Sequence, residues 1–253
     1  MNGFVTDPNL PIRCTSIIIG EKYSGFFDKP LESLSIEPIY VPDNPYISEK
    51  LSGHCDLSVF HAGENRLFLA PNLNGSRFSD KVREKGVEIE YLPVNQGKIY
   101  PNDAQLNACA VGKNLICNIN TLSPEIVNYF TSKGTNIISC RQGYTRCSVC
   151  VVDDNSIITS DRGAASACSS AGMNVLQISP GNIDLPGYEY GFIGGSAFKI
   201  SADKLAFTGN LNMHPDRNKI FDFLKFRNVE PVFLTENPVF DIGSAVPLTE
   251  ALY

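Results

Sequence analysis

Residues 147–159 read CSVCVVDDNSIIT, residues 161–171 read DRGAASACSSA, and residues 174–176 read NVL. The first stretch holds two short apolar runs around a polar turn, a pattern typical of a β-hairpin. The second has helical spacing and is followed by Gly172, a residue type that commonly ends helices. The third is a short apolar run that predicts one more strand. These residues therefore predict a unit in which two strands, a helix and a third strand follow one another (ββαβ).

The same unit recurs along the chain, and a fixed period of roughly 20–50 residues indicates a repeat or propeller architecture. A fifth unit is split between the two ends of the sequence. Residues 241–248 would supply its first strand, and residues 15–20, 30–34 and 36–40 its second strand, helix and last strand. The other hairpins are predicted at residues 56–70, 107–118 and 196–209, the helices at 79–85, 123–133 and 216–227, and the last strands at 87–89, 136–138 and 229–234.

Sharing one unit between both chain ends would close the repeats into a ring. The sequence therefore predicts an α/β fold, a five-bladed pseudo-fivefold α/β propeller of ββαβ repeats with one blade closed by both termini. A chain of 253 residues could form one domain or two. The ring predicts a single domain over residues 1–253.

Composition narrows the functional classes. The net charge is −6 and the basic residues are scattered, which argues against a nucleic-acid-binding surface. Residues 1–10 are polar and do not resemble a signal peptide, and no apolar run approaches 18 residues, so no membrane helix is predicted. We therefore expect a cytoplasmic protein with reduced thiols among its eight cysteines.

A closed ring of five ββαβ units resembles the pentein fold of the guanidino-group-modifying enzymes. These include arginine and agmatine deiminases, dimethylarginine hydrolases and amidinotransferases. The resemblance covers about residues 14–248. Three segments are most similar to an uncharacterised bacterial family described only as having this fold: QGYTRCSVC (142–150), PGYEYGFIGG (186–195) and DIGS (241–244).

The resemblance implies where chemistry would occur. In active members a cysteine attacks the guanidinium carbon, a histidine shuttles protons, and two carboxylates bind the guanidinium nitrogens. These groups lie at the inner ends of the first strands, around the pseudo-fivefold axis. Here His54-x-Asp56 is similar to the His-x-Asp/Glu element of the superfamily. Gly194-Gly195 is similar to its Gly-Gly-Asn/Asp element, with Ser196 where a carboxylate or amide often stands.

The nucleophile departs from the superfamily pattern. It usually lies near the C-terminus, where this chain has Ser244 and no cysteine. The thiol at an equivalent strand start is Cys147, two repeats after His54. If Cys147 is the nucleophile, the site is rotated around the ring relative to the termini.

The resemblance thus implies that Cys147 attacks, that His54 is the general acid and base, and that Asp56 and Asp241 hold the cation. The expected substrate is a small guanidinium or amidine compound. The expected reaction is that of a hydrolase or an amidinotransferase, and it requires no cofactor. Further candidates for substrate contacts are Asn107, Ser196, Ser244 and His214.

Each residue also has a structural interpretation. Cys147 could be a small buried residue at a strand end. His54 and Asp56, two apart on one face of a predicted strand, could be a satisfied polar pair. Asp241 could serve a turn, and His214 could serve the entry to a helix. His61, near a hairpin turn, is expected to be solvated.

Two further alternatives concern function. The chain could be a non-catalytic binding module on the same scaffold, and the missing C-terminal cysteine favours this. Cys147 and Cys150 form a CxxC pair, but alternation along a strand would place them on opposite faces, so no metal site is predicted. The loop at residues 180–191 is a candidate specificity element because it would connect two blades over the mouth of the ring.

Overall fold

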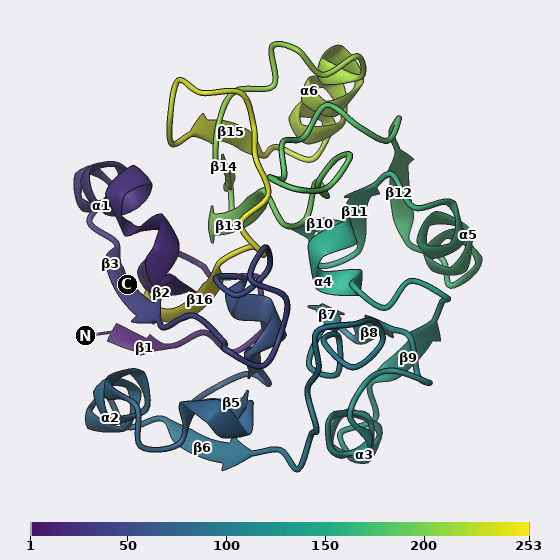
Figure 1. Ribbon diagram of the computed structural model, residues 1–253. Coiled ribbons are helices and arrows are strands. Elements are labelled where there is room, and N and C mark those ends of the chain that lie inside the picture. The colour runs from purple at the N-terminus through teal and green to yellow at the C-terminus, as the bar shows by residue number, and fades with distance from the viewer. Residues whose placement is uncertain (1, 253) are drawn as a thin grey trace.

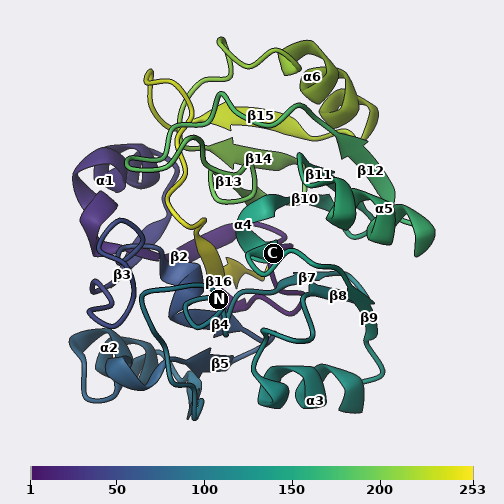
Figure 2. The ribbon, with the colours of Figure 1, turned by 45° about the vertical axis from the view of Figure 1, so that its right-hand side comes forward.

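In the computed structural model, which describes residues 2–252, five small sheets surround a central axis (Figure 1). In each sheet the last strand is parallel to its neighbour and the preceding pair is antiparallel. The helices α1, α2, α3, α5 and α6 lie at the outer rim (Figures 1 and 2). The predicted five-bladed α/β propeller is confirmed.

Four blades are continuous in sequence, and each has the predicted order of strand, strand, helix and strand. They comprise β4 (Val59–His61), β5 (Arg66–Leu69), α2 (Arg77–Glu84) and β6 (Glu88–Tyr91); β7 (Cys109–Val111), β8 (Asn114–Cys117), α3 (Pro124–Ser132) and β9 (Asn136–Ser139); β10 (Val149–Asp153), β11 (Ser156–Thr159), α5 (Arg162–Ser170) and β12 (Asn174–Gln177); β13 (Ala197–Ser201), β14 (Lys204–Phe207), α6 (Arg217–Phe226) and β15 (Glu230–Phe233).

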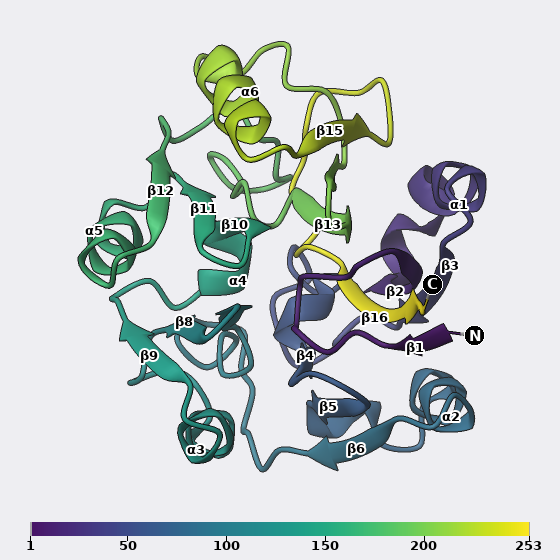
Figure 3. The ribbon, with the colours of Figure 1, turned by 180° about the vertical axis from the view of Figure 1, so that it is seen from behind.

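The fifth blade is built from both ends of the chain, as predicted. The strand β16 (Val246–Ala251) pairs antiparallel with β2 (Cys14–Gly20), which pairs parallel with β3 (Glu37–Val41). A strand that the sequence did not predict, β1 (Asn2–Phe4), adds to the other edge of β16. Seen from behind, β1 and β16 lie side by side at the two chain ends (Figure 3).

The helix of this blade, α1 (Ser24–Ser33), begins earlier than the predicted residues 30–34. Phe27 and Leu31 are one helical turn apart and both fully buried, so their apolar face holds the helix against the sheet. Pro30 lies inside the helix rather than at its start. The longest α-helices, α1 and α6, have 10 residues each, and no helix within residues 2–252 could span a membrane.

Apolar side chains fill the space between neighbouring blades. One cluster joins Ile18, Val246 and Leu248 of the shared blade to Val59 and Leu67 of the next. Another joins Cys150 and Ile158 of the third continuous blade to Leu205 and Phe207 of the fourth. Because each cluster takes side chains from two blades, no blade buries its apolar face alone.

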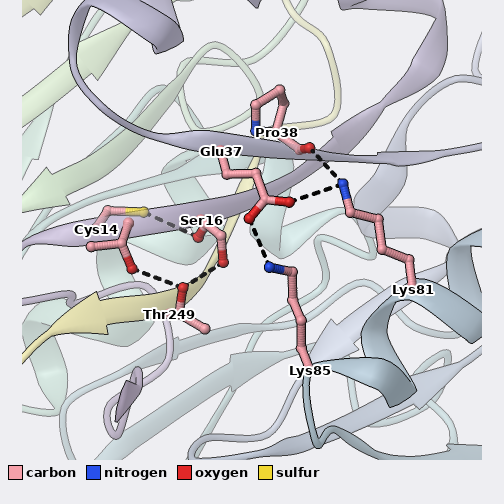
Figure 4. Close-up of polar contacts among 8 residues, drawn as sticks. Cys14, Ser16, Glu37, Pro38, Lys81, Lys85 and Thr249 are labelled. Atoms are coloured by element: carbon pink, nitrogen blue, oxygen red, sulfur yellow. Dashed lines mark hydrogen bonds and ion pairs between the residues drawn. The ribbon is translucent and has the colours of Figure 1, made fainter. Parts of the chain in front are cut away.

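Polar contacts fasten the shared blade as well (Figure 4). Thr249 of β16 is hydrogen bonded to Ser16 of β2, with 2.5 Å between the hydroxyl oxygens. Glu37 of β3 accepts from Lys81 at 3.0 Å, on α2 of the neighbouring blade, and from Lys85 at 2.7 Å, the residue directly after α2. These ion pairs are partly exposed, so the apolar interface contributes most of the stability.

Truncating the apolar interface should therefore open the ring. Leu248 is fully buried in the cluster that joins the shared blade to its neighbour. We expect Leu248→Ala to lower the free energy of unfolding by about 2–5 kcal/mol. Leu252→Ala, at a position 47% exposed, is the matched control and should cost less than about 0.5 kcal/mol. Urea unfolding followed by circular dichroism measures both, and equal effects would contradict this account of closure.

Candidate active site

Two short helical segments that stand directly before first strands carry or adjoin three of the four predicted catalytic residues. The 3-10 turn η2 (Cys55–Leu57) precedes β4 and contains Asp56, with His54 just before it. The single-turn helix α4 (Thr145–Ser148) precedes β10 and contains Cys147. The prediction that His54 and Asp56 share one face of a strand was wrong. The Leu57 N–H donates to the carbonyl of His54 at 3.2 Å and curls this segment into a turn.

The turns still bring His54, Asp56 and Cys147 together. The Cys147 thiol donates to Asp56 Oδ2 at 2.7 Å. A ring nitrogen of His54, an oxygen of Asp56 and the sulfur of Cys147 all lie within 4.8 Å of one another, and all three residues are buried. Within residues 2–252, His54 Nε2 and Asp56 Oδ1 have no hydrogen-bond partner. Unpaired polar atoms at a buried site leave donor and acceptor capacity for a ligand or water.

Asn107 holds the cysteine turn in place. Its Oδ1 accepts from the Arg146 N–H at 2.7 Å, and its Nδ2 lies 3.5 Å from Cys147 Sγ. The Arg146 guanidinium donates to the carbonyls of Gly194 at 3.4 Å and Ala245 at 3.2 Å. Arg146 thereby ties the cysteine turn to two other blades.

Asp241 approaches the same place from the segment before β16. Its carboxylate accepts from the Phe192 N–H at 2.8 Å and from the Gly243 N–H at 2.9 Å. A Cβ on Gly195 would lie 2.0 Å from Asp241 Oδ1, and one on Gly243 would lie 2.3 Å from the Cβ of His54. Gly243 also has φ of +70°. Only glycine leaves room for both side chains at the axis.

A cavity of about 280 Å³ opens onto these residues. His54, Cys147 and Asp241 line it, together with Glu189 at its exposed side. Asp56 lies behind Cys147 and does not line this cavity. Aromatic and aliphatic side chains form the rest of the wall: Tyr144, Tyr188, Tyr190, Phe192, Leu51, Leu57 and Leu185. A larger cavity, about 710 Å³, shares Asp241 and Leu185 with it.

The predicted substrate-contacting residues lie elsewhere. Asn107 contacts Cys147 rather than the cavity. The hydroxyl of Ser196 donates to the carbonyl of Ile193 at 3.0 Å, and that of Ser244 to the carbonyl of Ala197 at 3.4 Å. Neither serine lines the cavity.

The two remaining histidines do not line the 280 Å³ cavity either. His214 Nδ1 accepts from the Asp216 N–H at 3.1 Å, immediately before α6. His61 was expected to be solvated, and that was wrong. It is buried on β4, with Nε2 2.9 Å from the carbonyl oxygen of Glu64. The N-terminal segment covers this hairpin turn, where the Glu64 N–H donates to the carbonyl of Val5 at 2.9 Å.

Sequence reasoning found part of the cavity wall. The loop at residues 180–191 supplies Leu185, Tyr188, Glu189 and Tyr190, as its predicted place over the ring mouth suggested. Tyr144 was not singled out. Its position three residues before Cys147 was the available signal, because that spacing brings side chains together on a helical turn.

Burial shifts the pKa of each ionisable group in the site. It raises the pKa of Asp56 to about 6, although the Cys147 thiol and the Arg146 charge oppose this. Burial, with the Asp56 charge, raises the pKa of Asp241 to about 7. Burial and the Lys22 charge lower the pKa of His54 to about 3.

Burial also shifts the pKa of the Cys147 thiol. Burial, followed by the charges of Asp56 and Asp241, raises the pKa of Cys147 well above its ordinary value. At neutral pH the site therefore holds a protonated thiol beside an uncharged imidazole and two carboxyl groups. Added positive charge in the cavity would favour the thiolate.

His54, Asp56 and Cys147 also offer the nitrogen, oxygen and sulfur donors that zinc accepts. Two ligands of one tetrahedral zinc ion, with Zn–S of about 2.3 Å and Zn–O of about 2.0 Å, would lie about 3.5 Å apart. The Asp56 and Cys147 donor atoms are only 2.7 Å apart. The arrangement therefore fits a thiol hydrogen bonded to a carboxylate better than a pair of metal ligands.

Solved structures with the same architecture include several enzymes. The inosamine-phosphate amidinotransferase of Streptomyces griseus has a TM-score of 0.57 at 11% identity, with 97% of each chain covered. A Microseira wollei amidinotransferase of the saxitoxin biosynthetic pathway has a TM-score of 0.54 at 11% identity, covering 90% of this chain and 91% of that chain. C. jejuni agmatine deiminase has a TM-score of 0.53 at 10% identity, with 92% and 91% covered. The predicted pentein fold is confirmed.

The buried carboxyl of Asp56 should make stability depend on pH. Its pKa in the folded protein, about 6, exceeds the ordinary value of 3.8, so the folded state binds the proton more tightly. The resulting stability is fully present below about pH 4 and is lost as pH rises through 6. Asn cannot ionise, so Asp56→Asn removes this loss. We expect the change in unfolding free energy caused by the substitution to be about 3 kcal/mol more stabilising at pH 8 than at pH 4. Urea unfolding at both pH values measures this, with Asp222→Asn on the exposed face of α6 as the control. An effect of Asp56→Asn that is the same at both pH values would contradict it.

No curated protein sequence matches the chain. A family model described as "Family of unknown function (DUF6873)" matches residues 18–246. The matched range contains His54, Asp56, Cys147 and Asp241. The chain therefore belongs to the DUF6873 family, a family of unknown function.

Proposed function

We propose that this protein is a guanidino-modifying enzyme that uses Cys147 as its nucleophile. One observation carries the proposal: the thiol contacts Asp56, lies beside His54, and borders a cavity that Asp241 also lines. A nucleophile, a proton carrier and a carboxylate that can bind a cation therefore lie close together. The similarity to amidinotransferases and to an agmatine deiminase supports the same reaction class.

Asp241 is the group that would receive the cation. A guanidinium ion stays protonated throughout the physiological range, and its planar N–H groups pair well with a carboxylate. Its positive charge would favour the ionised forms of Asp241 and Cys147, which the buried site otherwise disfavours. Substrate binding would thus generate the nucleophile, and the thiol would stay protonated in the free enzyme.

The first chemical step forms a bond between Cys147 Sγ and the guanidinium carbon and breaks one carbon–nitrogen bond. The thiol proton passes first to Asp56, which already accepts it in a hydrogen bond. His54, which lies within reach of both Asp56 and Cys147, would carry a proton to the departing amine. The products of this step are the free amine and an amidino group bound to the sulfur.

The second step releases the amidino group to an acceptor. Attack by water breaks the sulfur–carbon bond, returns a proton to the thiol, and yields a urea in a hydrolase. Attack by a second amine yields a new guanidine in an amidinotransferase. The His54 imidazole is uncharged at neutral pH, so its ring nitrogen is available to take a proton from either acceptor.

One observation favours a second candidate, a binding module without catalysis. The raised pKa of Cys147 means that the free protein holds little thiolate. A buried, protonated thiol is also what a structural cysteine would show. The two candidates differ in whether a bound cation activates the sulfur.

A cationic electrophile should therefore label Cys147 selectively. Chloroacetamidine carries the charge of an amidinium, and chloroacetamide is its neutral counterpart. In the expected reaction a sulfur–carbon bond forms, chloride leaves, and the thiol proton passes to Asp56. We expect chloroacetamidine at pH 7.5 to label Cys147 at least about tenfold faster than chloroacetamide does. Peptide mass spectrometry identifies the labelled residue.

Cys140 provides an internal control because it is the one cysteine of the eight that is not fully buried. It should react with both reagents at similar rates. Cys147→Ala should abolish the selective label and leave the Cys140 label intact. Equal labelling of Cys147 by both reagents, or no labelling at all, would support the binding module instead.

A further inference from the structure

We propose that the substrate is a guanidine or amidine whose remaining part is apolar, preferably aromatic, and carries no carboxylate. This inference rests on the proposed function, because it assumes that the reacting cation lies beside Cys147 and Asp241. It concerns what the rest of the 280 Å³ cavity selects.

The charges of the cavity wall exclude an acidic substituent. Asp241 and Glu189 line the cavity, and none of its lining residues is a lysine or arginine. His54 is uncharged near neutral pH. One carboxylate of the wall would pair with the reacting cation. A carboxylate on the ligand would instead lie beside the negative Glu189 and apolar side chains. Burying an unpaired charge there is unfavourable.

The aromatic wall favours a planar apolar substituent. Tyr144, Tyr188, Tyr190 and Phe192 come from two segments and line one cavity. The Tyr144 hydroxyl donates to Asp103 Oδ2 at 2.8 Å, so its polar end is already satisfied outside the cavity. Paired aromatic rings are stabilised beyond the area that they bury, so this wall favours an aromatic substituent.

Two lysines line the other, larger cavity. Lys50 Nζ donates to the carbonyl of Gly187 at 2.9 Å and lies 5.4 Å from the ring centre of Tyr188. Lys22 Nζ lies 3.5 Å from the carbonyl oxygen of Glu49. Both lysines line the larger cavity, and Asp241 and Leu185 stand on the boundary between the two. Neither lysine lines the 280 Å³ cavity.

Two ligands that differ in a single carboxylate test this inference. Benzylguanidine and 4-(guanidinomethyl)benzoate are titrated calorimetrically into the Cys147→Ser variant, which cannot turn them over. We expect benzylguanidine to bind at least about tenfold more tightly at pH 7.5. Equal or tighter binding of the benzoate, or no binding of either ligand, would overturn the inference. The labelling of Cys147 by chloroacetamidine is a separate readout, so failure here leaves the proposed reaction class standing.

A charge reversal locates the selectivity. Glu189 is exposed, so Glu189→Lys should fold normally and place a cation at the cavity. We expect it to reduce the preference for benzylguanidine over the benzoate several-fold. Glu236→Lys makes the same change at an exposed position that does not line the cavity, and the preference should stay unchanged. An identical preference in both variants would assign the selectivity to another part of the protein.

Discussion

The pairing of β16 with β2 closes the ring, and the site depends on that closure. The segment that leads into β16 carries Asp241. As this segment enters the ring, the N–H groups of Ile242 and Ser244 donate to the carbonyl of Gly195 at 3.0 and 2.8 Å. The same path brings Gly243 against His54. Ring closure therefore assembles a site from residues that lie far apart along the chain.

Burial at the axis then determines the electrostatics. The carboxyl groups of Asp56 and Asp241 are removed from water, and their raised pKa values reflect the cost of ionising them there. The same burial keeps the Cys147 thiol protonated. A cation relieves all three penalties at once. An anionic or neutral ligand would not, so the site has an intrinsic preference for positive charge.

The repeat made the fold predictable from the sequence. Each hairpin, helix and third strand has a local signature, such as the Asp161 side chain, which accepts from the Ala164 N–H at 2.7 Å at the start of α5. Glycines at the axis marked where blades approach closely. The start of α1 was less predictable because Phe27 and Leu31 are fixed by packing against a sheet that both chain ends build.

The site was predictable in its residue types and less so in its geometry. Position in the repeat, together with the resemblance to guanidino-modifying enzymes, pointed to His54, Asp56, Cys147 and Asp241, although nothing local showed that the first two lie at a turn. Asn107 and Ser196 occupy equivalent positions in other blades, and Ser244 follows Asp241 in the segment before β16. All three use their side chains in hydrogen bonds within the protein. The loops that cover the cavity determine which of the five similar positions faces it. Sequence periodicity does not predict how those loops fold.

As the proposed nucleophile, Cys147 forms a covalent bond with the substrate carbon. Mass spectrometry of protein quenched with acid during incubation with benzylguanidine would detect that bond. We expect a mass increase of one amidino group, located on the peptide that contains Cys147. Product formation without that adduct, or an adduct on another residue, would contradict it.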